Sequence, residues 1–346
     1  MPPFDPDAAA SPDSGVFGLP FKRRESRVIL IPVPWDATTS YGKGTSMGPG
    51  AIREASMQVD LFDRRLGKVY EQGIHMLDEV ERLHEMNEEA GELADPIIAE
   101  GGATEDDAET LKKIEEASLE INRYVEAESA KALREGKVPG VVGGEHSVPF
   151  GSIKACAEHV AGKGIATGLG ILHVDAHMDF RDAFEGFAWS HASIMRNVLT
   201  RVPGVTKLVQ VGIRDFGAGE LAFAKEQGDR VAVHFDDDWA ERQMRGERWH
   251  DLCQKAIEPL PPQVYVSFDI DALDPSLCPY TGTPVPGGLS FHQACILLEL
   301  LRASGREVVG FDLVEVAPGP EGVSPIDSVV GARLLYKLCG VVMPKA

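Results

Sequence analysis

The chain has 346 residues, of which 43% are hydrophobic and 25% charged, and this suits one large α/β domain or two ordinary ones. Its formal charge of -20 argues against nucleic acid or an anionic membrane as partner and favours encounter with small cations. The five cysteines are odd in number and form no CxxC pair, so we expect packed thiols in a reducing compartment. No apolar run approaches the roughly 18 residues of a membrane span, and the start MPPFDPDAAASPDSG lacks the features of a secretion signal. We therefore expect a cytoplasmic protein.

The first 20 residues differ in composition from the rest of the chain. They are rich in Pro, Asp, Ser and Ala, which predicts an N-terminal arm or a disordered tail. The folded domain is then expected over residues 21–346.

From residue 27 onwards, eight short apolar runs end in polar residues. In chain order they are RVILIPVPWD, GIHMLDEV, VPGVVGGEHS, GLGILHVDAH, KLVQVGIRD, RVAVHFDDD, QVYVSFDID and EVVGFDLVEV. Helix-length segments separate most of them, at residues 150–162, 190–201, 217–227, 240–258, 290–303 and 324–341. Continuous hydrophobicity marks strands that are buried on both faces, so the pattern predicts a parallel sheet of about eight strands covered by helices. Ligands of such sheets bind beyond the carboxyl ends of the strands, where these polar residues fall.

One segment interrupts this alternation. Residues 78–120 are strongly acidic, and the tripeptide GGA at 101–103 separates two helical stretches. We interpret the segment as an inserted helical excursion with a solvated face. Surface decoration is its simplest role, and a lid or a subunit contact is the alternative.

The stretch HVDAHMDF, residues 173–180, concentrates ionisable groups at the end of a strand. Side chains of an extended chain alternate between two faces, so His173, Asp175, His177 and Asp179 would all point the same way. Buried together without a partner they would be costly, and a divalent cation is the usual remedy. We interpret His173, which lies deeper in the strand, as a core histidine or one that supports the ligands.

Two other strand ends offer further ligands. GGEHS supplies His146, and SFDIDALDP supplies Asp269 and Asp271. Taken alone, GGEHS could be an ordinary turn and DIDALDP an acidic turn. Together with Asp175, His177 and Asp179 they make six ligands, four of them carboxylates, which suit two dications bridged by shared carboxylates.

The ordered motifs GGEHS, DAHMD, SFDIDALDP and FDLVEVAP, with SHASIMRN between, resemble those of the ureohydrolase family of arginases and agmatinases. The resemblance covers about residues 27–340 and includes SYGKGTSMGPGAIREAS. It implies a three-layer α/β/α sandwich on a mainly parallel eight-stranded sheet. It also implies two divalent metal ions, manganese in most members and nickel in some, and a homo-oligomer, a trimer or hexamer, which could contain a related subunit.

The resemblance also assigns roles to residues. It places His146, Asp175, Asp179 and Asp269 on one metal and Asp175, His177, Asp269 and Asp271 on the other. A metal-activated water oriented by Asp179 would attack the guanidinium carbon, Glu315 would hold the guanidinium, and His191 would shuttle the proton to the leaving nitrogen. For His191 the alternative is that it only caps the following helix. Glu145 stands where the family commonly has Asp.

The substrate is expected to be a small cationic guanidino compound that yields urea and an amine or ammonia. The loop FRDAFEGFAWSHAS offers Phe180, Phe184, Phe187 and Trp189 rather than the small polar residues with which arginases hold an amino acid. This favours agmatine, guanidine or an alkylguanidine, as in the agmatinase-like and guanidine hydrolase branch. Arg181 keeps a guanidino acid open, and formimino compounds and biguanides are further alternatives.

Other classes fit the motifs less well. In metallophosphoesterases the D-x-H segment comes first, whereas here GGEHS precedes DAHMD. Metal-dependent deacetylases bind one zinc and use paired histidines, which this chain does not show. An inactive partner subunit would not need all six ligands together with His191 and Glu315.

Overall fold

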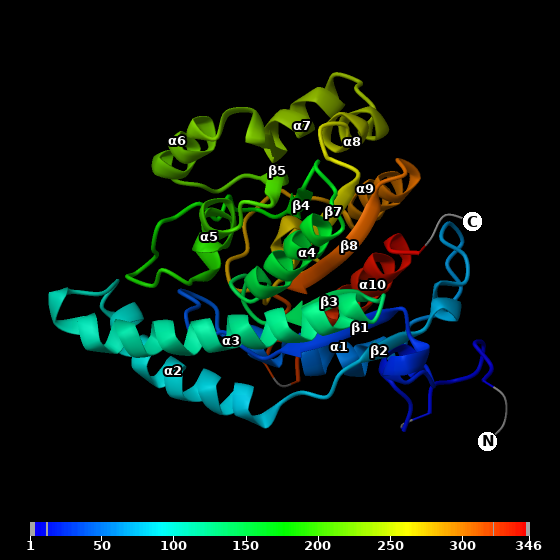
Figure 1. Cartoon of the computed structure of the whole chain (residues 1–346), viewed down its shortest axis with the longest axis horizontal. Helices are drawn as coiled ribbons and strands as arrows, with labels where there is room; N and C mark the ends of the chain where they lie inside the picture. Colours follow the sequence, from blue (N-terminus) through cyan, green and yellow to red (C-terminus); the bar gives the residue numbers. More distant parts are fainter. Residues whose placement is uncertain (1–3, 12, 321, 344–346) are drawn as a thin grey trace.

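A computed structural model describes residues 4–11, 13–320 and 322–343 of the chain. At its centre is an eight-stranded sheet in which every pairing is parallel, with the order β2-β1-β3-β8-β7-β4-β5-β6 (Figure 1). The strands are β1 Val28–Val33, β2 Ile74–Met76, β3 Val138–Gly143, β4 Leu169–Val174, β5 Val205–Ile213, β6 Val231–Phe235, β7 Gln263–Asp269 and β8 Glu307–Val314. Seven of the eight apolar runs contain one of them and the run KLVQVGIRD overlaps β5, so the predicted parallel sheet is confirmed.

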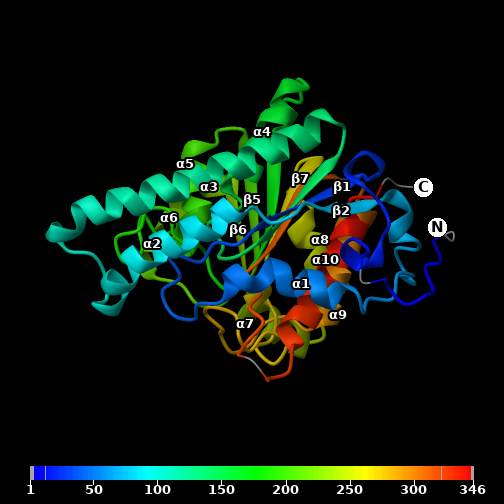
Figure 2. The same ribbon diagram turned by 90° about the horizontal axis from the view of Figure 1, so that it is seen from below.

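Helices cover both faces of the sheet, which confirms the three-layer α/β/α sandwich (Figure 2). One layer contains α3 Ala108–Arg134, α4 Phe150–Gly162 and α5 Ile194–Arg201, with α2 Glu81–Ala99 packed on α3. The other contains α1 Gly48–Ser56, α8 Trp249–Ile257, α9 Phe291–Ala303 and α10 Ile326–Val341. Helices α6 Ala218–Glu226 and α7 Asp236–Met244 pack beside β6. Within the described ranges, no helix combines the length and the hydropathy that crossing a bilayer requires.

The helix expected at 240–258 is in fact two helices. α7 ends at Met244 and α8 begins at Trp249. Gly246, between them, has φ of 96°, a left-handed conformation that glycine adopts without strain and that ends a helix. The other five helix-length segments each contain one helix, and the segment at 190–201 opens with a short 3₁₀ turn, His191–Ser193.

The acidic segment forms the expected pair of helices around GGA. α2 ends at Ala99 and α3 starts at Ala108, but α3 continues to Arg134, well beyond residue 120. The two helices lie side by side, and their connection projects beyond the sheet (Figure 2).

Part of the expected N-terminal arm belongs to the core. Val16, Phe17 and Leu19 are at most 2% exposed. The Phe17 ring packs edge-on against Tyr336 of α10, with centroids 4.9 Å apart. A tail therefore does not describe residues 16–19, whose apolar side chains are buried; residues 1–3 and 12 lie outside the described ranges.

The four central strands bring distant parts of the chain to one edge. β3, β8, β7 and β4 are successive neighbours in the sheet, and all run in the same direction. Their carboxyl ends therefore lie side by side. Seven of the predicted site residues stand at these ends or within five residues of them: His146, Asp175, His177, Asp179, Asp269, Asp271 and Glu315.

The second glycine of GGEHS is required by a close approach of two backbones. A Cβ on Gly144 would lie 1.9 Å from the Trp35 carbonyl oxygen and 2.9 Å from the Trp35 nitrogen. The same carbonyl oxygen accepts a hydrogen bond from the Glu145 amide at 2.8 Å. The turn that places His146 thus depends on the missing side chain.

Gly144→Ala is predicted to destabilise the fold by about 3 kcal/mol, because backbone atoms must move to admit the methyl group. Thermal unfolding followed by circular dichroism measures this. Gly162→Ala is the matched control, since a Cβ at this position would meet no described atom within 4 Å and alanine suits the last turn of α4. Equal unfolding temperatures for the two variants would contradict the close-approach explanation.

Candidate metal centre and substrate cavity

The predicted ligands gather into two adjoining groups at the carboxyl edge of the sheet. In the first, His146 Nδ1 lies 2.8 Å from Asp175, 3.3 Å from Asp179 and 3.2 Å from Asp269. In the second, His177 Nδ1 lies 3.0 Å from Asp271 and 3.6 Å from Asp175. Asp175 contacts the histidines of both groups through its two oxygens, the position that a bridging ligand would need.

The electrostatics of the cluster call for a cation. All four aspartates are at most 4% exposed, and the ion pairs that they form in the described part of the chain are all with histidine. Burial, together with the charge of neighbouring aspartates, raises the pKa of Asp179 and Asp269 well above the usual range. Carboxylates and imidazoles in these numbers match the ligand set of two hard or borderline divalent cations.

His146 is oriented by a hydrogen-bond chain that sequence reasoning missed. Its Nε2 lies 2.9 Å from Ser267 Oγ, and this hydroxyl donates to Asp312 Oδ1 at 3.1 Å. Ser267 therefore accepts from Nε2–H, which leaves the lone pair of Nδ1 facing the aspartates. Ser267 stands two residues before Asp269 and Asp312 lies in FDLVEVAP, so both were inside the recognised motifs, but neither type of residue signalled this role.

His173 lies within the first group, where its ring could reach a metal, and it is also hydrogen-bonded to Asp175. Gln210 Nε2 donates to His173 Nδ1 at 2.9 Å, so Nε2 carries the proton and donates it to Asp175 at 2.8 Å. Burial disfavours the charge of Asp175, but His173, His146 and His177 outweigh burial and hold the pKa of Asp175 well below its usual value. Gln210 was also missed, because nothing in its local sequence marks it for this role.

Two site residues have backbones in the left-handed region. Asp179 has φ of 58° and Glu315 has φ of 62°, which costs about 1–3 kcal/mol for a residue with a side chain. Strained backbones of this kind concentrate at functional sites. Glu315 is held in place because its amide donates to Gly144 O at 2.8 Å and its carbonyl accepts from Thr281 Oγ1 at 2.8 Å.

The carboxylate of Glu315 has one oxygen free for a ligand. Oε1 accepts the His146 amide at 2.8 Å, whereas the buried Oε2 has no hydrogen-bond partner among the described residues. Burial, and then the charge of Glu145, raise the pKa of Glu315 well above its usual value. A cation placed beside Oε2 would relieve this cost.

Glu145 is bonded to the loop that follows β1. Its carboxylate accepts from the Thr38 amide at 3.1 Å and from the hydroxyls of Thr38, Thr39 and Ser147. Burial raises the pKa of Glu145 to about 7. The Glu145 side chain thus ties residues 38–39 to the end of β3.

A cavity of about 490 Å³ opens above the cluster and reaches His177 and Asp179. Its other lining residues come from four loops and the first turn of α6: Ser40, Tyr41, Arg181, Phe184, His191, Ala192, Asp215, Phe216, Glu220, Thr283, Pro284 and Val285. Gly282, beside the free oxygen of Glu315, directly precedes the last three. Asp215 ends one of the eight apolar runs, so the strand-end rule for parallel sheets could have indicated it, whereas nothing in the sequence marked Thr283.

Of the four aromatic residues noted after the DAHMD motif, only Phe184 lines the cavity. Phe180, Phe187 and Trp189 are at most 5% exposed and pack in the core. Arg181 lies over the Phe184 ring at 4.8 Å, and its Nε is 3.7 Å from Glu220. The glycine-rich segment near residue 42 contributes Ser40 and Tyr41 to the mouth of the cavity.

His191 lines the cavity and does not cap a helix. Its Nε2 lies 3.4 Å from Ser40 Oγ, and neither the 3₁₀ turn nor α5 has a side-chain cap. Burial, and then the nearby imidazoles of His177 and His146, lower the pKa of His191 to about 4. Its ring is therefore neutral at physiological pH, with one donor and one acceptor nitrogen.

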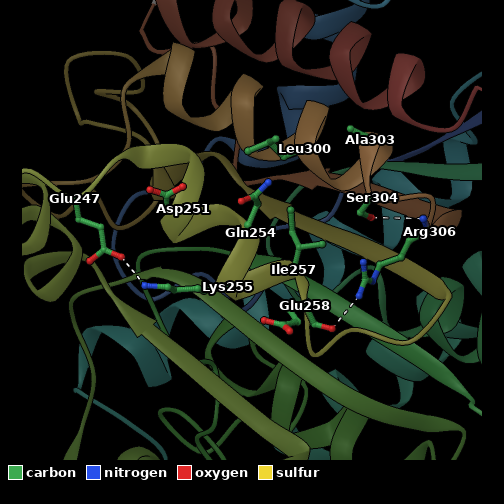
Figure 3. A pocket seen from close by; sticks show the side chains of 10 residues that line it. All are labelled: Glu247, Asp251, Gln254, Lys255, Ile257, Glu258, Leu300, Ala303, Ser304 and Arg306. Atoms are coloured by element: carbon green, nitrogen blue, oxygen red, sulfur yellow. Dashed lines mark hydrogen bonds and ion pairs between the residues drawn. The ribbon is translucent and has the colours of Figure 1, made fainter.

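A larger cavity, about 680 Å³, lies at the opposite edge of the sheet, where β7 and β8 begin (Figure 3). Its charged side chains are largely satisfied: Lys255 pairs with Glu247 at 2.7 Å, and Arg306 donates to the Glu258 carbonyl at 2.8 Å. The eight residues of β8 span about 26 Å, so this cavity is far from Glu315. The volume of a cavity alone therefore does not identify the functional site of this protein.

The chain is similar to known proteins in both sequence and fold. The sequence matches the arginase family over residues 26–340. It is 33% identical over 319 residues to N(1)-aminopropylagmatine ureohydrolase of Thermus thermophilus, covering 92% of this chain and 90% of that protein. It is 30% identical over 322 residues to guanidinobutyrase of Pseudomonas aeruginosa, covering 89% and 84%. The structure resembles proclavaminate amidino hydrolase from Streptomyces clavuligerus with a TM-score of 0.70 at 25% identity, covering 97% of this chain and 99% of that one.

Asp175→Ala is predicted to remove bound metal, because among the four aspartates only Asp175 contacts the histidines of both groups. Purified protein loaded with Mn²⁺ or Ni²⁺ and desalted would be measured by elemental analysis, and the variant should retain less than about a tenth of the wild-type metal. Asp78→Ala is the control, since the Asp78 side chain is 98% exposed. Full metal stoichiometry in Asp175→Ala would exclude a bridging role.

Proposed function

The chain belongs to the arginase family, and we propose that it is a metal-dependent amidinohydrolase that cleaves a C–N bond of a small guanidino compound, releasing urea and an amine or ammonia. The observation that carries the proposal is the joined pair of aspartate–histidine groups beneath a cavity, with the free, buried carboxylate oxygen of Glu315 beside them. A guanidinium ion supplies the cation that this oxygen needs.

The residues fit a binuclear metal centre. His146, Asp175, Asp179 and Asp269 would hold one ion, and Asp175, His177, Asp269 and Asp271 the other. Two bound dications would supply a water molecule that is nucleophilic at neutral pH. Carboxylate-rich ligands suit Mn²⁺ and imidazoles also accept Ni²⁺, so we propose one of these two metals.

Three residues act on the substrate and the attacking water in this proposal. Guanidinium is resonance-stabilised and a poor electrophile, so its carbon must be held close to the water. Glu315 Oε2 would bind the guanidinium N–H groups, and Asp179, which lines the cavity, would accept a hydrogen bond from the water and orient it. The neutral ring of His191 would take up a proton on one nitrogen and deliver it to the leaving nitrogen.

The cavity favours a substrate whose tail is cationic or uncharged. Phe184, Phe216 and Val285 offer apolar contacts, and Asp215 adds an exposed carboxylate. Arg181 is already engaged by Glu220 and Phe184, which weakens it as a partner for a substrate carboxylate. We therefore propose agmatine, guanidine or an alkylguanidine as substrate. A guanidino acid is the second candidate, because Arg181 lines the cavity and one relative is a guanidinobutyrase.

We also propose a cytoplasmic homo-oligomer, a trimer or hexamer. All five cysteines are free and buried, and burial raises the pKa of Cys253 and Cys295 to about 12. Unreactive, unpaired thiols support a reducing compartment.

The proposal is tested by urea release from guanidine, N-methylguanidine, agmatine, 4-guanidinobutyrate and arginine, with enzyme loaded separately with Mn²⁺ and Ni²⁺. We expect urea from agmatine or from one of the two small guanidines, and none above background from arginine. Metal-loaded enzyme that releases no urea from any of the five would contradict the proposed substrate class.

His191→Ala is predicted to retain both metals and to lower kcat by about 10²- to 10⁴-fold, because it removes a proton-transfer group and no ligand. Elemental analysis and steady-state kinetics on the best substrate measure the two effects. Loss of metal from this variant would show that His191 belongs to the ligand set instead.

A further inference from the structure

Helix α2 contacts a loop that lines the cavity, although α2 itself contributes no lining residue. This first cavity loop comprises residues 36–46 and carries Ser40 and Tyr41. Asn87 of α2 accepts a hydrogen bond from the Asp36 amide at 2.7 Å and donates one to Asp36 Oδ1 at 3.0 Å. The other oxygen of Asp36 accepts from the amides of Gly44, at 2.8 Å, and Ser46, at 3.1 Å. Asn87 thus fixes the Asp36 carboxylate, which connects the start of the loop to its end.

A second contact fixes the same loop further along α2. Lys43, near the end of the loop, pairs with Asp95, which lies two turns after Asn87 on α2. Both partners are at least 36% exposed, so this pair adds little on its own. It is a second point of contact between the first cavity loop and α2.

The far end of α2 is attached to a different loop of the cavity. This second cavity loop comprises residues 181–191 and carries Arg181, Phe184 and His191. Phe187, 4% exposed, packs in an apolar cluster with Ala94 and Ile97 of α2 and Ile114 of α3. Ala103, in the connection after α2, donates its amide to Glu185 O at 3.0 Å. Figure 1 shows this connection beside the segment that precedes α5.

Phe187 is in turn connected to Phe184, whose side chain lines the cavity. The backbones of Phe187 and Phe184 exchange two hydrogen bonds, of 2.8 and 3.1 Å. The Phe184 ring then stands edge-on to the His191 ring, with centroids 5.9 Å apart. The position of Phe184 is therefore linked to the cluster that α2 and α3 form.

The two cavity loops also contact each other directly above the site, where the His191 ring lies near Ser40 and the backbone of Thr38. There Ser40 Oγ of the first loop lies 3.4 Å from His191 Nε2 of the second. The Ser40–His191 hydrogen bond is long and therefore weak. In α2, Asn87 and Ala94 are seven residues, about 10 Å, apart on continuous helix, and Pro96, which removes a backbone hydrogen bond, lies after them. The helix therefore connects the two loops independently of their direct contact at His191.

We propose that α2 is a brace that fixes the two cavity loops relative to each other and so sets the width of the substrate cavity, with Asn87 and Phe187 as its positioning residues. The expected effect on substrate specificity rests on the proposed function, whereas the connection of the two cavity loops through α2 does not. Neither residue contacts an aspartate of the metal cluster, and Thr38 and Thr39 remain bonded to Glu145 without α2.

Hydrogen–deuterium exchange of the full-length protein tests the linkage without any substrate. Asn87→Ala and Phe187→Leu should each increase the exchange rate by about tenfold in peptides from both cavity loops. The controls are Glu88→Ala, on the exposed face of α2, and Phe291→Leu, the same exchange of side chains on α9. If each variant loosens only the loop that it touches, α2 makes two independent contacts and the brace is excluded.

Kinetics on agmatine and guanidine test the consequence for specificity. Asn87→Ala should raise KM for the better substrate by about tenfold, change kcat by less than about threefold, leave metal content unchanged and narrow the preference between the two substrates. Unchanged KM and preference, equal to those of Glu88→Ala, would overturn the role in specificity. A wild-type enzyme that hydrolyses neither substrate nor any other guanidino compound would instead count against the proposed function, and the exchange result would still decide the linkage.

Discussion

Four buried aspartates share one edge of the sheet, and their mutual repulsion is the constraint on which the rest of the structure depends. Histidines partly offset it: His146 and His177 face the carboxylates, and His173 donates to Asp175 from behind. Imidazoles cannot balance four carboxylates at neutral pH without taking up protons, whereas two dications would balance them fully. The parallel sheet stabilises this arrangement, because its buried apolar strands fix the positions of the carboxylates at their carboxyl ends.

The hydrogen bonds around the cluster show how this arrangement is maintained. Ser267 and Asp312 set the tautomer of His146, and Gln210 sets that of His173. Each of these residues lies within a strand, where the backbone is rigid. The positions of the metal ligands therefore depend on the sheet, whereas the cavity above them is lined mainly by loops.

Much of the fold could be predicted from the sequence, because continuous apolar runs are a strong sign of strands buried on both faces. The order of the strands could not, since nothing local indicates that β3 pairs with β8, more than 160 residues later in the chain. Gly246, the left-handed residue that ends α7, was likewise hidden within an otherwise helical pattern. Within the site, charged residues at strand ends could be recognised by type and spacing. Ser267, Gln210 and Asn87 could not, because neutral polar residues acquire a role only through the partner that the fold gives them.

The metal ligands lie on rigid strand ends, whereas the cavity above them is lined mainly by loops. This difference has an evolutionary consequence. Changes in α2 act on the cavity from a distance, through Asn87 and Phe187, and leave the strand ends intact. Substitutions in this helix would therefore change the shape of the cavity while the metal ligands stay in place. An insertion that first looked like surface decoration would then be the part of the chain where substrate range is most free to diverge.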